Sequence, residues 1–397
     1  MSARVALAFA VALVAVAVAG LWLGGHPHSL PEPLRDVFVE ETGGLTAEAA
    51  EAIEGSYYRS VGGHELSNAS LQGMVRRLRK SNEEDRYSEY FSPDALDRFN
   101  EQIEGHFSGI GVEIDRVKAG SEIVKVFRGS PAEEAGLEPG DTLVSVEGKP
   151  IGRRDSAEVR DEVIGPEGTQ VTLGVRDGKS GKTKELTITR AQVSFPNVSG
   201  RTEKVNGRKL GYVKMLSFSE ASHAQLARGV EKVEREGAEG IVLDLRHNPG
   251  GLLDEAVLSA NVFLPQDEVV VSTRSRTQGN SVHKTPGEPS SGLPVVVLID
   301  GATASAAEIL TAALADNAGS TVVGTRSYGK GLFQEEEKLA NGGALKLSVG
   351  EFFTPEGVNL AKSRGIHPDV KVKDDPETKA DEARERGLRL LAGQIDG

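Results

Sequence analysis

The chain has 397 residues, of which 38% are hydrophobic, and it contains 47 glycines and 17 prolines. This length suggests two or three domains with ample material for a core, and the composition excludes a disordered or fibrous chain. The formal net charge of −13 argues against a nucleic-acid partner, and the absence of cysteine excludes a disulfide framework, a thiol nucleophile and a cysteine-based zinc site.

The N-terminal residues 5–23, VALAFAVALVAVAVAGLWL, form an uncharged apolar stretch after Arg4. As a helix this stretch would be about 28 Å long, close to the hydrocarbon thickness of a bilayer. Trp22 suits an interfacial aromatic, and Arg4 favours placing the rest of the chain outside the cytoplasm. We therefore predict a membrane anchor in residues 1–24. The small residues ending at Ala19 leave removal as a signal peptide open, and either alternative gives an extracytoplasmic protein, anchored or secreted.

Residues 25–104 are predicted to be a linker followed by a helical region. The prolines of HPHSLPEPLRD make a stiff spacer, and the apolar periodicity predicts helices near residues 45–58 and 66–80. His26 and His28 lie close together in the linker, but no third ligand is near them, so we expect no metal site there.

Residues 105–192 are predicted to form a small β-rich domain, because short runs such as IVKVF and TLVSVEG alternate with glycine-containing turns. In GSPAEEAGLEPGD, Ser130 can cap a short helix and Glu133 completes a capping box. Upstream, SGIGVEI offers backbone N–H groups that could converge on a carboxylate before a strand edge opens.

This order of motifs resembles a PDZ domain. The resemblance implies that a peptide adds to the domain as an extra strand, since this mode of binding needs an open loop and a free edge. The terminal carboxylate of the peptide would be held by the backbone of Gly109, Ile110, Gly111 and Val112. The alternative is that the two glycines only shape a turn.

From Gly211 on, the pattern becomes α/β, with the strand-like GYVKML and GIVLDL on either side of a helical pattern. PVVVLID is a continuous apolar run typical of a strand buried on both faces, and STVVGT and ALKLSVGEFFT add strands. We predict a layered sheet with crossover helices in residues 193–375 and a helical tail in residues 376–397. Active groups in such folds commonly lie where strands end and helices begin.

Ser305 lies at such a point, in LIDGATASAAEILTAALADNAG. The SAAE tetrapeptide is typical of a capping box, in which the Ser305 side chain caps the helix and the Glu308 side chain bonds back to the Ser305 N–H. That role alone could explain the serine. However, its small neighbours leave space around the hydroxyl. A helix N-terminus also presents N–H groups to developing negative charge, which suits a nucleophile.

A serine nucleophile needs a base, and the sequence offers histidines or a lysine. His247 and His367 lie in loops, but neither belongs to a recognisable triad motif. Lys330 lies between two glycines, which permit close approach of other backbone, and burial would lower the pKa of its amine. Gln334 follows four positions later.

Four motifs around the PDZ-like insert carry a family resemblance: DRYSEYFSP, DLRHNPGG, GATASAAEI and GTRSYGKGLFQ. Together, and in this order, they resemble the carboxyl-terminal processing (tail-specific) peptidases. The resemblance covers about residues 66–372.

The resemblance implies a Ser/Lys dyad that cleaves peptide bonds. In that scheme Ser305 is the nucleophile, Lys330 is its general base and Gln334 orients the lysine. The backbone N–H groups of Gly251 and Ala306 would form the oxyanion hole.

The resemblance further implies an α/β protease core with crotonase-like layers of sheet and helices, into which the PDZ domain is inserted. The expected function is an extracytoplasmic serine endopeptidase that cleaves proteins near their C-termini, with the PDZ domain recognising the tail. Ile164 stands where many relatives carry an arginine, so we expect altered coupling between the two domains.

The expected partners are proteins or peptides with free C-termini and, through the N-terminal segment, a membrane; a homo-oligomer stays open. No cofactor, metal or nucleic acid is expected. Two alternative functions are a non-catalytic PDZ scaffold at the membrane and a crotonase-type acyl-CoA enzyme.

Overall fold

The computed structural model describes residues 41–82, 85–104, 106–117, 120–152, 154, 156–194, 197–375 and 380–396. The predicted anchor and the linker histidines lie outside these residues. Within them, no helix has the length and apolarity needed to cross a bilayer. The chain divides into one compact unit that ends at Ser81 and another that begins at Asn82.

The described part of the first unit contains two helices, α3 (Glu41–Ser56) and α4 (Gly63–Ser81). Both lie where the apolar periodicity predicts helices. Val75 of α4 is buried, whereas the basic run RRLRK that follows it is exposed and forms a solvated face of the helix.

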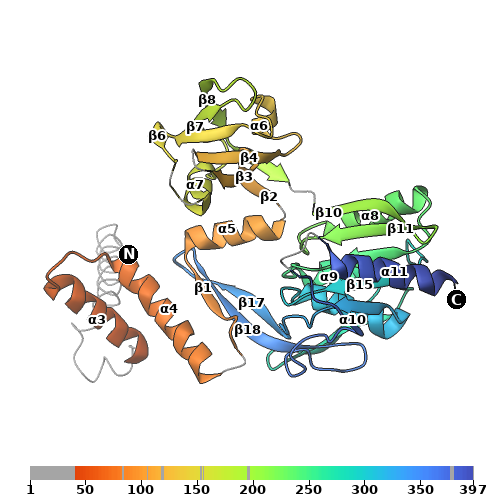
Figure 1. The fold of residues 1–397 in the computed structure, drawn as a ribbon. Coiled ribbons are helices and arrows are strands. Elements are labelled where there is room, and N and C mark those ends of the chain that lie inside the picture. The colour runs from red at the N-terminus through yellow and green to blue at the C-terminus, as the bar shows by residue number, and fades with distance from the viewer. Residues whose placement is uncertain are drawn as a thin grey trace, which may run out of the picture. The chain divides into compact units, whose positions relative to one another are not determined.

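The second unit begins with β1 (Glu89–Phe91) and α5 (Pro93–Glu104) and then forms a small antiparallel domain. Its main sheet has the order β3-β4-β5-β7-β8, so β3 is an edge strand among the described residues, while β2 pairs with β9 (Figure 1). The elements are β2 (His106–Gly109), β3 (Val112–Val117), β4 (Gly120–Val126), α6 (Pro131–Glu134), β5 (Thr142–Val146), β6 (Lys149–Pro150), α7 (Ser156–Val163), β7 (Gln170–Arg176), β8 (Thr183–Thr189) and β9 (Ala191–Ser194).

The predicted cap of α6 forms with one difference. The Ser130 hydroxyl accepts from the Glu133 N–H at 3.3 Å, as expected of an N-cap. The Glu133 carboxylate accepts from the N–H of Gly129 at 2.7 Å, one residue before the cap. The two predicted residues therefore cap the helix start, but the Glu133 carboxylate binds the N–H of Gly129 and not that of the N-cap residue Ser130.

The core of the second unit contains a six-stranded sheet in the order β10-β11-β12-β15-β16-β19. Strand β10 is antiparallel to β11, and the strands from β11 to β19 run parallel. The strands are β10 (Val198–Val205), β11 (Arg208–Met215), β12 (Ile241–Asp244), β15 (Val295–Ile299), β16 (Thr321–Gly324) and β19 (Val370–Lys371). Every residue of β15 is buried, as its continuous apolar run predicts.

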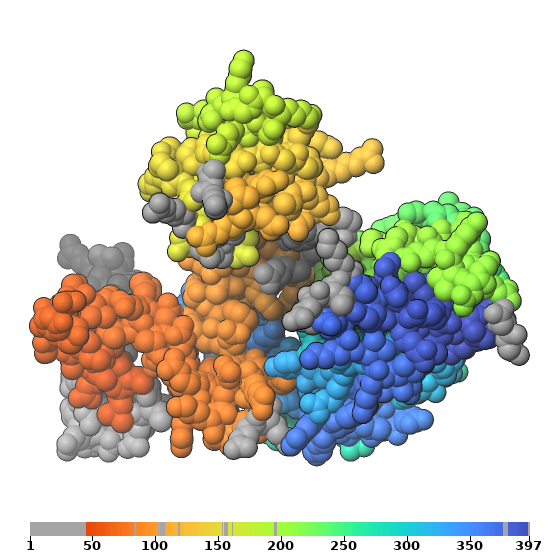
Figure 2. Space-filling model, viewed as in Figure 1, coloured from red at the N-terminus to blue at the C-terminus, as the bar shows by residue number. Residues whose placement is uncertain are grey.

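Helices cover both faces of this sheet. Alternate residues of β15 divide between two apolar clusters: Val297 packs with helices α8, α9 and α10, whereas Val296 and Leu298 pack with α11. Figure 2 shows the dark-blue C-terminal helix beside the green β10–β11 segment. The helices are α8 (Ser222–Arg235), α9 (Leu253–Ala260), α10 (Ala306–Ala318) and α11 (Glu382–Asp396).

Arg246 binds the C-terminal segment to the loop after β12. Its buried guanidinium donates to Asp244 at 2.8 Å, to Asp374 at 2.9 Å and to Asp381 at 2.7 Å. Burial alone would raise the pKa of Asp381, but the hydrogen bonds and charge of Arg246 outweigh it and hold that pKa below its usual value.

A second sheet carries the long hairpin of β17 and β18. Strand β18 pairs with β17, β1 and β13, and β13 pairs in turn with β14. The ALKLSVGEFFT segment is therefore a strand as predicted, but it belongs to this sheet and not to the parallel one. The elements are β13 (Val269–Ser275), β14 (Gly279–Lys284), β17 (Leu332–Lys338) and β18 (Ala344–Phe353).

Candidate active site

Ser305 occupies a sharp turn between strand β15 and helix α10. The loop before it is closed by Asp300, whose Oδ1 accepts the N–H groups of Ala302 and Thr303 at 3.0 Å each. Ser305 itself has φ 55° and ψ −120°, a conformation that is uncommon for a residue with a side chain. In the predicted capping box, the Glu308 carboxylate accepts from the Ser305 N–H at 2.8 Å.

The NPGG loop lies against this turn. Asn248 is buried, and its carbonyl oxygen accepts from the Ala304 N–H at 3.0 Å. Its side chain accepts from the Gly250 N–H at 2.9 Å and donates to the Met215 carbonyl oxygen at 3.1 Å. A Cβ on Gly250 would lie only 2.8 Å from the Cβ of Ser305, so the two loops are in close contact.

Two backbone N–H groups beside Ser305 are free of hydrogen bonds within the described part of the chain, those of Gly251 and Ala306. Ala306 is the first residue of α10, where an N–H has no partner inside the helix. Gly251 has φ 150° and forms a parallel bridge with Phe218, whose carbonyl oxygen binds the N–H of Leu252 instead. Free N–H groups of this kind can accept a developing oxyanion.

Lys330 is half-buried on a loop that packs against the Ser305 turn. The Tyr328 N–H donates to the Thr303 carbonyl oxygen at 2.9 Å, and the Lys330 N–H donates to Glu308 Oε2 at 2.9 Å. Because a Cβ on Gly331 would lie 1.9 Å from the Ala361 nitrogen, the glycines around the lysine do permit close approach of other backbone.

Burial lowers the pKa of the Lys330 amine, and the negative charge of Glu308 acts in the opposite direction without cancelling the effect. The Nζ atom lies 5.1 Å from the centre of the Tyr87 ring. Burial raises the pKa of Tyr87 to about 12, so its phenol stays protonated and is no competing base near neutral pH.

The structure brings the Ser305 and Lys330 loops together, but Gln334 is oriented elsewhere. Its side chain donates to the Leu332 carbonyl oxygen at 2.9 Å and to the Ser348 hydroxyl at 3.5 Å. In the described residues, no hydrogen bond joins the side chains of Ser305, Lys330 and Gln334 to one another. Such bonds often tighten only when substrate is bound.

Asp85, for which the sequence predicts no role, supports this region from the DRYSEYFSP motif. Asp85 is buried and accepts from the hydroxyls of Ser88 at 2.6 Å and Ser348 at 2.8 Å, and from the Tyr87 N–H at 3.2 Å. Burial would raise its pKa, but these hydrogen bonds outweigh burial and lower it. Asp85 thus fixes both Tyr87 and the hydroxyl that Gln334 contacts.

Lys346 is a second half-buried lysine, and no motif in the sequence marks it. Burial and the charge of Lys330 lower its pKa to about 8. Its Nζ lies 4.0 Å from the centre of the Phe99 ring and 5.9 Å from that of Phe91. The only sequence signal was its place in an alternating strand, which does not distinguish it from an ordinary exposed lysine.

The two loop histidines are not bonded to Ser305. His247 is exposed, and its Nδ1 lies 2.9 Å from Asp300. His367 is also exposed.

The proposed carboxylate loop of the small domain has free donors as well. The N–H groups of Ile110 and Gly111 donate no hydrogen bond within the described residues. Gly109 ends β2 and Val112 begins the edge strand β3. Gly111 has φ 82°, and a Cβ there would lie 2.3 Å from the Cβ of Ser130, so only glycine fits.

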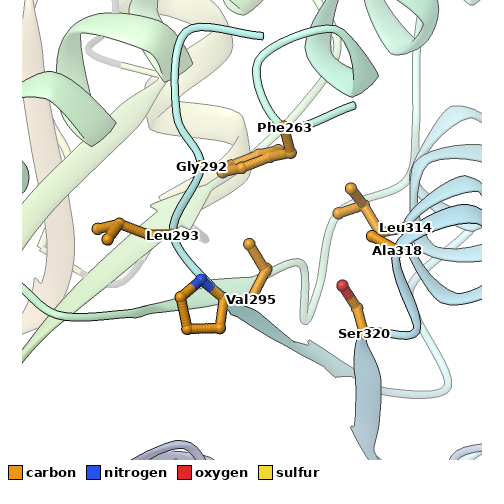
Figure 3. Close-up of a pocket in the computed structure, with 8 residues that line it drawn as sticks. Phe263, Gly292, Leu293, Val295, Leu314, Ala318 and Ser320 are labelled. Carbon is orange, nitrogen blue, oxygen red and sulfur yellow. The ribbon is translucent and has the colours of Figure 1, made fainter. Parts of the chain in front are cut away.

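A small hollow of about 200 Å³ lies at the opposite end of α10 (Figure 3). Phe263, Leu293, Val295 and Leu314 contribute apolar side chains to it. Because the 13 residues of α10 span about 20 Å, this hollow is remote from Ser305 and is not part of the candidate site.

Comparisons with known proteins agree with the motifs. Residues 209–372 match peptidase family S41, and residues 122–177 match the PDZ domain. The chain is 31% identical over 326 residues to the carboxy-terminal processing protease CtpA of Bacillus subtilis, covering 82% of this chain and 68% of that protein.

A further relative is the "Probable CtpA-like serine protease" of Staphylococcus haemolyticus, which is 33% identical over 327 residues. That alignment covers 82% of this chain and 63% of the relative, so the chain spans less than two thirds of its length. Among solved structures, the photosystem II D1 C-terminal processing protease is similar with a TM-score of 0.50 and 26% identity, over 89% of this chain and 98% of that one. The resemblance carried by the motifs is thus confirmed, and the chain belongs to peptidase family S41 and contains a PDZ domain.

Proposed function

We propose that the chain is a serine endopeptidase that cleaves protein substrates near their C-termini, with Ser305 as nucleophile and Lys330 as general base. One observation carries the proposal: the turn of Ser305 and the loop of Lys330 bind the same carboxylate oxygen of Glu308, beside two free N–H groups. Membership of family S41 supports the same reaction.

In the proposed first step, the neutral amine of Lys330 removes the proton from Ser305 Oγ while Oγ bonds to the carbonyl carbon of the scissile peptide. The carbonyl oxygen takes up negative charge and accepts from the N–H groups of Gly251 and Ala306. The lysine ammonium then protonates the leaving nitrogen as the C–N bond breaks. Water, deprotonated by the same amine, hydrolyses the acyl-enzyme, and the proton returns to the serine oxygen.

Gln334 is proposed to orient the Lys330 amine in the substrate complex. For this its side-chain amide must leave the Leu332 carbonyl oxygen and turn toward the lysine. The contact with Ser348 is 3.5 Å long and therefore costs little to break.

The PDZ domain is proposed to bind the free C-terminus of the substrate. The free N–H groups of Ile110 and Gly111 suit a carboxylate, and the edge strand β3 can pair with an added strand. Gly109 and Val112 would flank the bound carboxylate.

We further propose that the enzyme acts outside the cytoplasm, held at a membrane by residues 5–23 or secreted after their removal. The apolar length of that segment and the position of Arg4 support this location. We also propose that the layered core is related in architecture to the crotonases, because helices cover both faces of its parallel sheet.

The test is cleavage of a peptide panel by the wild-type protein and by Ser305→Ala. The proposal expects cleavage by the wild type and none by the variant, with both proteins folded. A scaffold would cleave nothing in either form. An acyl-CoA enzyme would turn over thioesters and leave the peptides intact.

A further inference from the structure

Glu308 is a buried carboxylate that contacts both loops of the proposed active site. It lies in the first turn of α10 and is 0% exposed. Its Oε2 accepts from the N–H groups of Ser305 at 2.8 Å and Lys330 at 2.9 Å. Its Oε1 accepts from the Gly329 N–H at 2.8 Å and the Ser327 hydroxyl at 2.5 Å.

All four neighbours of the carboxylate act as donors. Three are backbone N–H groups, which can only donate. The fourth, the Ser327 hydroxyl, itself accepts from the Ile366 N–H at 2.6 Å and so directs its proton to Glu308. Burial raises the pKa of Glu308, and the four hydrogen bonds act in the opposite direction by favouring the ionised form. Among the described residues no acceptor is left for a proton on Glu308, so the ionised carboxylate is the form that satisfies the hydrogen bonds.

A helix cap needs only one of these four bonds. The bond to Ser305 completes the capping box, whereas the other three reach a loop 19 to 22 residues further along the chain. Each oxygen joins a different pair of donors, and Oε2 joins the nucleophile turn directly to the lysine.

We propose that Glu308 is a positioning residue, which fixes the Ser305 turn and the Lys330 loop at the separation that proton transfer between them requires. This inference rests on the proposed function, because it assigns Glu308 to the same site. The carboxylate does not contact the reacting atoms. It acts through the backbone of the two residues that do.

The charge of Glu308 has a second, measurable effect. Burial lowers the pKa of Lys330 and the Glu308 charge raises it, so removal of the charge lowers that pKa further. Among the described residues, the other groups placed near Lys330 are the ring of Tyr87 and the amine of Lys346 on β18. Neither carries a negative charge at neutral pH.

Two substitutions distinguish the effect of the length of the Glu308 side chain from the effect of its charge. Glu308→Gln keeps the length of the side chain but places an NH2 group against two donors, whichever way the amide turns. Glu308→Asp keeps the charge but is one methylene too short to reach all four donors. We expect both variants to lose about 100-fold in kcat, because misplacing a base by about 1 Å has that effect. KM should stay within about threefold, since the peptide contacts are unchanged.

The pH profile distinguishes positioning from a general loss of structure. In Glu308→Gln the acidic limb of the residual activity should move to lower pH, whereas in Glu308→Asp it should stay near that of the wild type. Thermal melting of each variant establishes that it is folded. Should neither fold, Ser327→Ala removes a single donor and leaves the carboxylate, and a loss of about tenfold in kcat is expected from it.

Glu255→Gln is the matched control. Glu255 is also a buried carboxylate, and it accepts from the N–H groups of Ala221 at 2.9 Å and His223 at 2.8 Å and from the Ser222 hydroxyl at 3.0 Å. Its donors belong to the start of α8 and not to the Ser305 or Lys330 loops. This variant should lose thermal stability but keep kcat within about threefold and leave the pH profile unmoved.

Folded Glu308 variants with a kcat within about threefold of the wild type would overturn the inference, as would an unmoved acidic limb in Glu308→Gln. A Ser327→Ala variant with wild-type kcat would do the same. These outcomes differ from failure of the proposed function, in which the wild-type protein itself would cleave no peptide.

Discussion

Two opposing effects determine how readily Lys330 gives up its proton. Burial penalises the charged ammonium, while the Glu308 carboxylate and the face of the Tyr87 ring favour it. Burial is the larger effect, so the pKa lies below the ordinary lysine value of 10.5. The neutral amine that a base requires is therefore more abundant at a given pH than in a solvated lysine.

The pH dependence of activity follows from this balance. We expect kcat/KM to rise with pH through the pKa of Lys330 and to level off above it, because only the deprotonated amine accepts the serine proton. The midpoint should lie below that of a solvated lysine. Initial rates on one peptide across the pH range measure it. A maximum at about pH 5 would instead indicate a carboxylate base.

For single residues, the sequence predicts those roles that depend only on the residues next to them in the chain. The capping box at Ser305 and Glu308 and the glycines beside Lys330 were readable, because a helix start and a close backbone approach have local signatures. The three further donors of Glu308 were not, since they are brought to it by the fold. The same holds for Tyr87, whose ring meets a lysine distant in sequence.

The NPGG loop and the Ser305 turn form a pair of elements that must fit closely. Gly250 has φ 92°, and a Cβ on it would lie 2.6 Å from the Ala304 carbonyl oxygen. Asn248 holds the loop from the other side through bonds to Met215 and Ala304. Any side chain at Gly250 therefore displaces the loop that carries the Gly251 N–H.

Gly250→Ala should consequently lower kcat by about 100-fold, because displacing an oxyanion donor costs about that much. Gly357→Ala is the control: Gly357 has a similar φ of 82°, but nothing lies within 4 Å of the added Cβ. The control carries the backbone strain without the displacement and should keep its kcat. Kinetics and melting of both proteins make the comparison. Wild-type kcat in Gly250→Ala would refute the role of this loop.

Element identity was predictable where it depends on local pattern. The buried run PVVVLID became β15, and the cap at Ser130 starts α6. The pairing of strands was not predictable in the same way. Strand β18 has an ordinary strand sequence, but its place in the second sheet depends on pairing with β1 and β13, which are far away in the chain.

On the scale of the whole molecule, a PDZ domain and a family S41 peptidase core share one chain. The motifs in their order were enough to predict the family. They leave open how the two domains communicate, because that depends on their arrangement with substrate bound. Ile164, which follows α7 and donates its N–H to the Arg160 carbonyl oxygen at 2.8 Å, stays the predicted point of altered coupling.

Amidation of the substrate tail tests this communication. An amidated peptide lacks the carboxylate charge but keeps its scissile bond, so kcat/KM should fall at least about tenfold if the N–H groups of Ile110 and Gly111 bind the tail. A variant without residues 107–190 should show no preference between the two peptides. Equal cleavage of free and amidated peptides by the full chain would rule out recognition of the tail by the PDZ domain.

Covalent labelling by a fluorophosphonate tests the central claim most directly, because the reagent needs an activated serine and no knowledge of the substrate. The labelled protein is digested and the adduct located by mass spectrometry. We expect the adduct on Ser305, loss of labelling in Ser305→Ala, and labelling slowed at least about 100-fold in Lys330→Ala, with all three proteins folded. An adduct on another residue, or wild-type labelling in Lys330→Ala, would contradict the assignment of nucleophile and base.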